Sequence, residues 1–171
     1  ELLSSTQDSQ VMVLDVGCGG GVLLHKVKEM MPQSITYGVE PNELYADLAR
    51  RKSGAREIKT GYFSSELFKC RFDVVLLCDV LEHVESPDLF LKDIYSSLNK
   101  GGVLFLEVPS PTNFNFLEPS HDIFNIAHHV FYTNDTLRSY LDDIGFIDIN
   151  IVDIEYKNNA WKLRVTAKNS I

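Results

Sequence analysis

The residues whose types and spacing most suggest chemistry follow a short apolar run at residues 11–14. After this run comes Asp15, and then glycine at every second position: Gly17, Gly19 and Gly21. An acid and a glycine cluster after an apolar run are typical of a buried parallel strand that ends in a tight turn before a helix. Glycine allows positive φ and lets a ligand lie directly against the main chain. The turn therefore predicts a crevice of nucleotide size at the start of a helix.

A second candidate is Glu40, the last residue of a β-rich run at residues 34–40. A carboxylate at the carboxyl end of a second strand can accept both hydrogen bonds of a ribose diol, and these bonds are strong because the acceptor is charged. Glu40 is therefore predicted to bind a ribose. The alternative is a solvated acid at the N-terminus of the helix that Pro41 and Asn42 begin.

A third group follows the buried run at residues 74–77, where the chain reads Asp79-Val80-Leu81-Glu82-His83-Val84. With the D-x-G-x-G-x-G pattern of residues 15–21, this stretch resembles two motifs of the class I S-adenosylmethionine-dependent methyltransferases. The resemblance is to the small-molecule subgroup, whose signature ends Leu-Glu-His-Val. It covers residues 11–108 well and the rest of the chain loosely.

The resemblance implies that S-adenosyl-L-methionine is the cofactor and that the glycine loop packs against its methionine part. It also implies that residues 78–80 face the methionine end and that His83 lies near the floor of the cleft. We expect His83 to hold its loop by a hydrogen bond rather than to act in catalysis. The predicted cofactor-binding residues are Asp15, Gly17, Cys18, Gly19, Gly21, Glu40, Tyr62, Cys78, Asp79, Val80 and His83.

The chain departs from the family pattern after the third predicted strand. Family members often place an Asp there, near the adenine, whereas this chain reads Gly61-Tyr62-Phe63. Tyr62 or Phe63 could stack on the adenine, and the alternative is that either ring belongs to the core.

The segment at residues 109–131 is where substrate identity is expected, because it follows the fifth predicted strand and three prolines break its regular structure. An oxygen or nitrogen acceptor can require a general base. The catalytic candidates are His121, His128 and His129, with Glu118 and Asp122 as further acids of the same segment.

Two alternatives remain for these side chains. The first is a metal site, but no fixed ligand spacing is present, so no metal is predicted. The second is that the histidines have no chemical role. The neighbours His128 and His129 cannot both point into the cleft if the chain is extended there, so at most one is expected to do so.

These residues must be positioned by a Rossmann-like, doubly wound α/β sheet of seven mostly parallel strands, with helices on both faces and the last strand antiparallel by family analogy. We expect residues 1–10 to be disordered or loosely attached and residues 11–171 to form a single domain. In the helix after residue 42, the stripe Leu44, Tyr45, Leu48 and Ala49 is expected to be buried. Strands are expected at residues 11–15, 34–40, 55–60, 71–78, 103–108, 147–154 and 162–167.

Composition limits the classes of partner. The 171 residues carry a net charge of −8 without a Lys/Arg cluster, which disfavours nucleic acid and favours a small-molecule acceptor. No apolar stretch reaches the roughly 20 residues of a membrane span, and there is no signal peptide, so a cytoplasmic location is expected. The three cysteines fit buried thiols in a reducing compartment. Because the chain starts at Glu1, we expect N-terminal helices that close over the cofactor to be missing from it.

Three functions compete. The first is a methyltransferase acting on a small molecule, with a sugar or envelope-glycan precursor suggested by residues 131–146, which resemble the tail of such enzymes. The second is a methyltransferase-like module that binds the cofactor without turnover. The third is a nicotinamide-dependent oxidoreductase, which is opposed by Val22 at the third glycine position of the dinucleotide fingerprint. The oligomeric state is left open.

Overall fold

A seven-stranded sheet forms the centre of the protein in a computed structural model that describes residues 10–112, 114–118, 120–121, 124–155 and 160–171. The strand order is β3-β2-β1-β4-β5-β7-β6. The strands are β1 (Met12–Val16), β2 (Ile35–Glu40), β3 (Glu57–Thr60), β4 (Phe72–Cys78), β5 (Leu98–Ser110), β6 (Phe146–Glu155) and β7 (Trp161–Asn169). The helices are α1 (Val22–Met30), α2 (Glu43–Lys52), α3 (Pro87–Ser97) and α4 (Asn134–Ile144), with short 3₁₀ turns η1 (Leu81–His83) and η2 (Phe114–Phe116).

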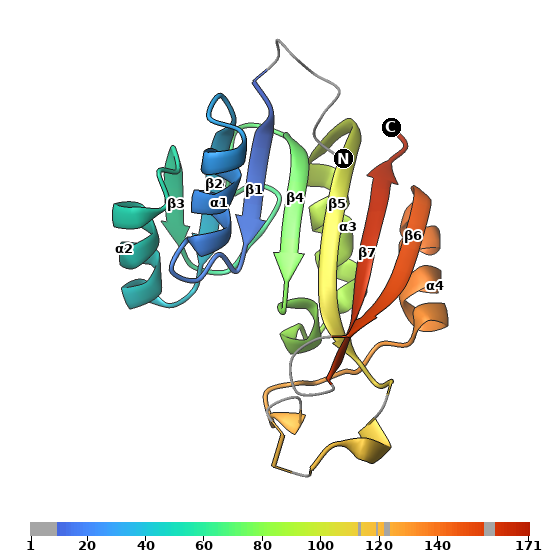
Figure 1. The fold of residues 1–171 in the computed structure, drawn as a ribbon. Coiled ribbons are helices and arrows are strands. Elements are labelled where there is room, and N and C mark those ends of the chain that lie inside the picture. The colour runs from blue at the N-terminus through green and yellow to red at the C-terminus, as the bar shows by residue number, and fades with distance from the viewer. Residues whose placement is uncertain (1–9, 113, 119, 122–123, 156–159) are drawn as a thin grey trace.

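The direction of the strands confirms the predicted fold class. Strands β1 to β5 pair in parallel, whereas β7 is antiparallel to both β5 and β6, so that β6 runs with the other five. The carboxyl ends of β1, β2 and β4 therefore meet at one edge of the sheet, and the segment after β5 lies below that edge in Figure 1.

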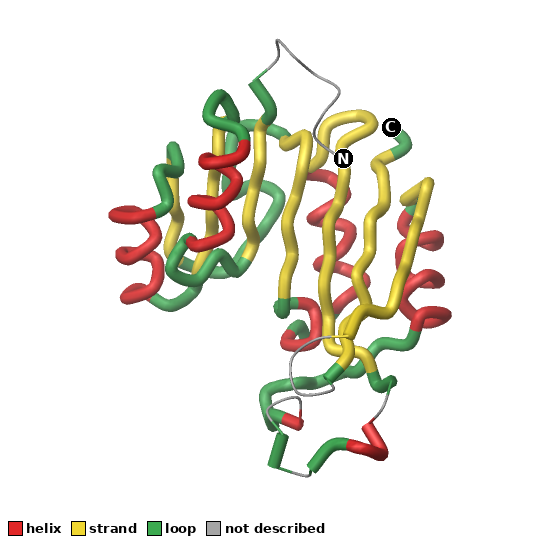
Figure 2. Tube along the Cα trace, in the orientation of Figure 1, coloured by secondary structure: helices red, strands yellow, loops and turns green. Residues whose placement is uncertain are grey.

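Alternation along β1 shows why helices cover both faces. Leu14 and Val16 belong to the large core that also holds Leu91 of α3 and Leu137 of α4. Val13, which points the opposite way, packs with residues of α1. The two layers of helices are visible in Figure 2, where red helices lie on either side of the yellow strands.

The predicted buried stripe of α2 is wrong in part. Leu44 is 79% exposed and Tyr45 is 55% exposed, and the buried residues are Ala46 and Ala49. The reason is the close approach of α2 to the glycine turn: a Cβ added at Gly21 would lie 3.0 Å from the Cα of Ala49. Only small side chains fit at such a helix contact, so the larger ones face outward.

Strand β5 is longer than predicted at both ends. Leu98 pairs with Phe72 directly after α3, and the pairing resumes at Val103 after a shift in register. At the other end Ser110 pairs with Trp161, so the predicted insertion at 109–131 begins inside the sheet. The predicted disorder of residues 1–10 concerns positions that, up to residue 9, lie outside the described residues. Within the described part of the chain, no helix has the length and apolar character that crossing a membrane requires.

Candidate active site

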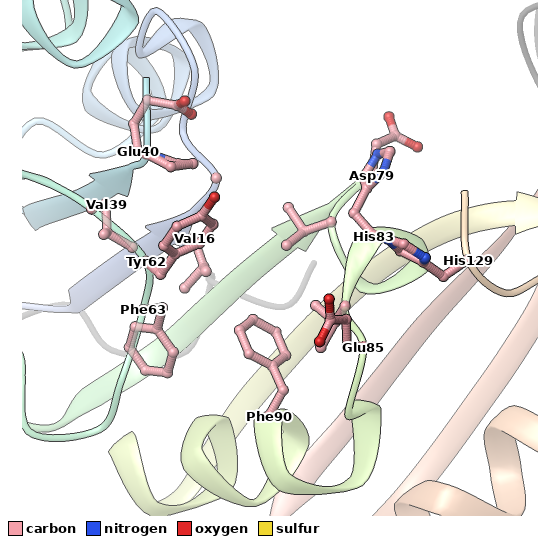
Figure 3. Close-up of a pocket in the computed structure, with 15 residues that line it drawn as sticks. Val16, Val39, Glu40, Tyr62, Phe63, Asp79, His83, Glu85, Phe90 and His129 are labelled. Atoms are coloured by element: carbon pink, nitrogen blue, oxygen red, sulfur yellow. The ribbon is translucent and has the colours of Figure 1, made fainter. Parts of the chain in front are cut away.

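A cavity of about 740 Å³ opens at the carboxyl ends of β1, β2 and β4 (Figure 3). This is the edge at which open α/β sheets bind ligands, and the volume lies in the usual range for small-molecule sites. Apolar and aromatic groups dominate its wall, with a few polar side chains among them. The lining residues are Val16, Gly17, Val39, Glu40, Pro41, Gly61, Tyr62, Phe63, Asp79, Val80, His83, Val84, Glu85, Phe90 and His129.

The glycine loop is held against β2 by its own backbone. The Val39 carbonyl accepts hydrogen bonds from the N–H groups of Gly17 and Cys18, at 2.9 and 3.1 Å. Gly17 has φ +74°, and a Cβ there would lie 2.5 Å from a methyl group of Val80. Glycine is therefore required at this position for both conformation and space, because the loop after β1 touches the loop after β4.

Glu40 connects the glycine loop to the start of α2. Its Oε2 accepts a hydrogen bond from the Gly19 N–H and its Oε1 accepts one from the Asn42 N–H, both at 2.9 Å. The side chain is buried yet lines the cavity. A carboxylate offers about four lone pairs, so two remain for a ligand such as a diol.

Asp15 does not belong to the cavity lining but lies behind it. Its side chain is buried on the α1 side of β1, and it does not line the cavity. Burial, and secondly the charge of Glu40, raise the pKa of Asp15 to about 7. Asp15 is thus a buried group whose charge depends on pH near neutrality.

Asp79 lies at the end of β4 with a strained backbone. Its φ is +55°, which a non-glycine residue seldom adopts, and its N–H donates to the Glu107 carbonyl at 3.0 Å. Its carboxylate accepts a hydrogen bond from Lys162 Nζ of β7 at 2.5 Å. An ion pair between residues far apart in the sequence therefore holds one wall of the cavity.

His83 fastens the segment after β5 to the loop after β4. Its Nδ1 lies 2.8 Å from the Ala127 carbonyl oxygen, and the His129 N–H donates to the Glu82 carbonyl at 2.8 Å. The rings of His83 and His128 meet edge to face, with centroids 4.9 Å apart. The expected hydrogen bond of His83 is present, and its acceptor belongs to the predicted substrate segment.

Glu82 is a buried acid beside this junction. It is 1% exposed, and neither carboxylate oxygen finds a hydrogen-bond partner among the described residues. Burial is the main reason that its pKa rises to about 7, and the charge of Asp79 adds to the rise. Buried polar groups are nearly always satisfied in folded proteins, so this carboxylate requires an explanation.

The structure brings many of the predicted residues together but not all of them. Gly17, Glu40, Tyr62, Asp79, Val80 and His83 line the cavity, as does His129. His128 packs on His83 instead, in keeping with the expectation that at most one of the two neighbours faces the cleft. Outside the lining are Asp15, Cys18, Gly19, Gly21, Cys78 and His121. Asp122 lies outside the described residues.

The cysteines near the site have no features of nucleophiles. Burial raises the pKa of Cys18 to about 12 and that of Cys78 to about 12, and Asp15 contributes to both shifts. Neutral thiols of this kind act as small apolar groups. All three cysteines are free.

The sequence patterns did not predict several residues of the lining, nor Lys162, which lies outside the lining and pairs with Asp79. Phe90 of α3 makes an edge-to-face contact with Phe63, with ring centroids 6.0 Å apart. The one sequence signal for Phe90 is that it is an apolar residue next to Leu91, which is buried in α3. Lys162 gave no local signal, because its relation to Asp79 depends on where β7 enters the sheet.

Comparisons with known proteins fit this geometry. The ubiquinone biosynthesis O-methyltransferase of Coxiella burnetii is 31% identical over 109 residues, which is 61% of this chain and 44% of that protein. The chain spans less than half the length of the curated relatives that it matches first.

Solved structures share the fold at low sequence identity. A SAM-dependent methyltransferase from Archaeoglobus fulgidus superposes with a TM-score of 0.73 at 21% identity, over 94% of this chain and 86% of that chain. The [4+2]-cyclase SpnF superposes with a TM-score of 0.75 at 16% identity, over 96% of this chain and 77% of that chain. The family described as methyltransferase domain matches residues 1–150. The chain therefore belongs to the methyltransferase domain family, and the expected class I, S-adenosylmethionine-dependent type is confirmed.

Proposed function

We propose that this protein transfers a methyl group from S-adenosylmethionine to a hydroxyl group of a small molecule. One observation carries the proposal: a single cavity joins the glycine loop and Glu40 to His129 of the segment after β5. Membership of the methyltransferase domain family argues against the alternative of a nicotinamide-dependent oxidoreductase. The names of the curated relatives support an oxygen acceptor.

The residues present fit the cofactor. Glu40 is held in place by two backbone N–H groups and retains lone pairs for a ribose diol. Gly17 and Gly19 have positive φ, which favours glycine, and without a Cβ they leave the loop open for the methionine part. When bound, S-adenosylmethionine supplies an activated methyl group on a sulfonium.

The chain itself then has to orient the acceptor and receive a proton. Alignment of two reactants can account for several kcal/mol of the barrier. His129 lines the cavity, and an imidazole there could accept the proton of a hydroxyl group. Phe63, Phe90 and Val84 give part of the wall an apolar surface.

The acceptor is proposed at the level of a small hydroxylated molecule. The aromatic lining and the relatives named for ubiquinone biosynthesis favour a hydroxylated ring. A sugar or envelope-glycan precursor, predicted from the tail of the chain, stays a prediction and belongs in the same screen.

A second candidate is a module with this fold that does not transfer methyl groups. It is favoured by the similarity to a [4+2]-cyclase, since a shared fold does not fix the reaction. Turnover separates the two candidates.

The first test is calorimetric titration with S-adenosylmethionine and S-adenosylhomocysteine, with NADH as the control ligand. Both sulfur ligands should bind saturably and NADH should not. Glu40→Ala should weaken binding on the order of 100-fold, because it removes two charge-assisted hydrogen bonds to the ligand. Glu43→Ala, at an exposed site on the next helix, should bind as the wild type does.

Thermal unfolding of both variants is needed, because Glu40 also holds the backbone of Gly19 and Asn42. Formation of S-adenosylhomocysteine with hydroxylated aromatic and sugar acceptors then tests turnover. Binding without any turnover would favour the second candidate, and binding of NADH alone would refute the proposal.

A further inference from the structure

The unexplained feature of the site is the Glu82 carboxylate, buried without a hydrogen-bond partner among the described residues. One carboxylate oxygen of Glu82 and one ring nitrogen each of His83 and His128 all lie within 4.8 Å of one another. They come from two parts of the chain, since Glu82 and His83 belong to η1 and His128 to the segment after β5. The cluster is at the side of the proposed catalytic cavity, which His83 also lines.

The donor set matches one class of ligand. Two imidazoles and a carboxylate suit Zn²⁺ and related borderline transition metals, whereas Mg²⁺ and Ca²⁺ prefer oxygen donors alone. Two ligands of one zinc ion lie at most about 4 Å apart, so side-chain shifts on the order of 1 Å would close the site.

The hydrogen bond of His83 prepares its ring for such a role. A carbonyl oxygen can only accept, so the contact with Ala127 requires that Nδ1 carries a hydrogen, and the ring nitrogen that can bind a metal is then Nε2. Metal-binding histidines characteristically donate their other ring N–H to a carbonyl or carboxylate in this way, which fixes the ring.

We propose that Glu82, His83 and His128 form a binding site for a divalent transition metal of the zinc type. The bound cation supplies the missing partner of Glu82 and cross-links η1 to the segment after β5. The metal ion would hold in place the part of the segment after β5 that carries His129 into the cavity lining. The site does not depend on the proposed methyl transfer, because metal binding can be measured without either substrate.

The test uses the chain without a histidine tag, stripped of metal by chelation. Titration with Zn²⁺ in competition with a chromogenic chelator should give one site per chain, and Mg²⁺ should not compete. Zn²⁺ should also raise the midpoint of thermal unfolding, since a ligand that binds the folded state alone stabilises it. Absence of a stoichiometric zinc site in the wild type would overturn the proposal.

Variants assign the ligands. Glu82→Gln and His128→Ala should each weaken zinc binding at least about 10- to 100-fold, the loss typical of an outer-shell partner alone. His25→Ala, at an exposed position on α1, is the matched control and should bind as the wild type does. Equal affinity of His128→Ala and the wild type would contradict the assignment.

A second readout does not depend on the stability of the variants. Co²⁺ bound to the wild-type chain should give the visible absorption of a low-coordinate site with nitrogen and oxygen donors. Conservative His128→Asn should weaken or change that spectrum while the protein remains folded by circular dichroism. A spectrum identical to that of hydrated Co²⁺ would refute the site.

Discussion

Two carboxyl groups under the glycine loop have different environments. Glu40 accepts two backbone hydrogen bonds and reaches the cavity, whereas Asp15 is buried behind it. Burial and the nearby charge of Glu40 raise the pKa of Asp15 to about 7. The two acids therefore differ in what they can do: Glu40 lies where it can meet a ligand in the cavity, whereas Asp15 changes its charge near neutral pH without lining the cavity.

The stability of the protein should depend on pH through Asp15. In the unfolded chain the pKa of Asp15 returns to 3.8, so between pH 4 and 7 the folded state holds a proton that the unfolded state has lost. The wild type should therefore lose stability relative to Asp15→Asn as the pH rises through this window, by up to about 4 kcal/mol. Chemical denaturation at several pH values measures the difference.

The matched control for this experiment is Asp142→Asn, at an exposed position of α4. Its pH profile should follow that of the wild type. A constant difference between wild type and Asp15→Asn from pH 4 to 8 would contradict the assignment of the shift to Asp15.

At the scale of single residues, local patterns predicted only part of the site. Glu40 was found because an acid after a second strand has a defined place in this kind of sheet. Glu82 was quoted in a motif but not as a site residue, since its burial depends on the segment that packs over it. Lys162 was not found, because 83 positions separate it from Asp79.

At the scale of elements, the contact between α1 and α2 depends on Gly21. A Cβ there would lie 2.7 Å from the Cβ of Ser53 and 3.0 Å from the Cα of Ala49, whereas a Cβ at Gly19 would meet nothing within 4 Å. Both glycines have positive φ. An alanine at Gly19 would therefore report backbone strain alone, whereas an alanine at Gly21 would report backbone strain together with the steric clash against α2.

Gly19→Ala should cost about 1 kcal/mol of stability, the usual order for an alanine forced into the left-handed region. Gly21→Ala should lower the free energy of unfolding by about 1–3 kcal/mol more, because the new Cβ would press on the backbone of α2, which cannot move aside as a flexible side chain can. The free energy of unfolding in urea measures both. Equal losses would show that the helix contact adjusts freely.

Helix α4 begins with a capping box that can be tested alone. Thr133 Oγ1 accepts from the Thr136 N–H at 3.2 Å, and Thr136 Oγ1 accepts from the Thr133 N–H at 2.9 Å. Thr133→Ala should reduce the free energy of unfolding by about 1 kcal/mol, as is typical when a cap is removed. Ser139→Ala, at an exposed position within the same helix, should cause no loss, and a similar loss in both variants would count against the cap.

Apolar spacing indicates the buried residues of a helix correctly where the whole apolar face packs against a single hydrophobic core. In α3, Leu91 and Ile94 lie three positions apart, as residues on one face of a helix do, and both are fully buried. In α2 the prediction failed at Leu44 and Tyr45, because hydrophobicity alone does not show how closely two helices approach. The added length of β5 was missed for a similar reason: its first residues pair across a shift in register that no local pattern reveals.

At the scale of the whole molecule, charge bears on the choice of partner. With a net charge of −8 the chain should not bind nucleic acid. Fluorescence anisotropy with labelled duplex DNA and structured RNA at low salt should show no saturable binding, since phosphate contacts require clustered basic residues. Saturable binding that weakens as salt is added would contradict the expected small-molecule acceptor. The expected cytoplasmic location stays a prediction.

The overall architecture followed from the order of strands and helices, but one part came only through resemblance. Nothing in the residues of β7 shows that it runs against its neighbours. Its antiparallel direction was expected by family analogy, and the antiparallel pairing of Leu106 with Val165 confirms it. Its place between β5 and β6 was not predicted.

The place of β7 also affects how the chain can be made. A ribosome delivers β5 and β6 before β7, and these two strands do not pair with each other until β7 enters between them. Until β7 has been synthesised, the edge of β5 that β7 will occupy has no partner strand. This exposed edge can pair with the strand of another chain. Strand β7 joins the two parts of the sheet and is synthesised after the other six strands. Until then the unpaired edge of β5 must not pair with other chains, because such pairing would lead to aggregation.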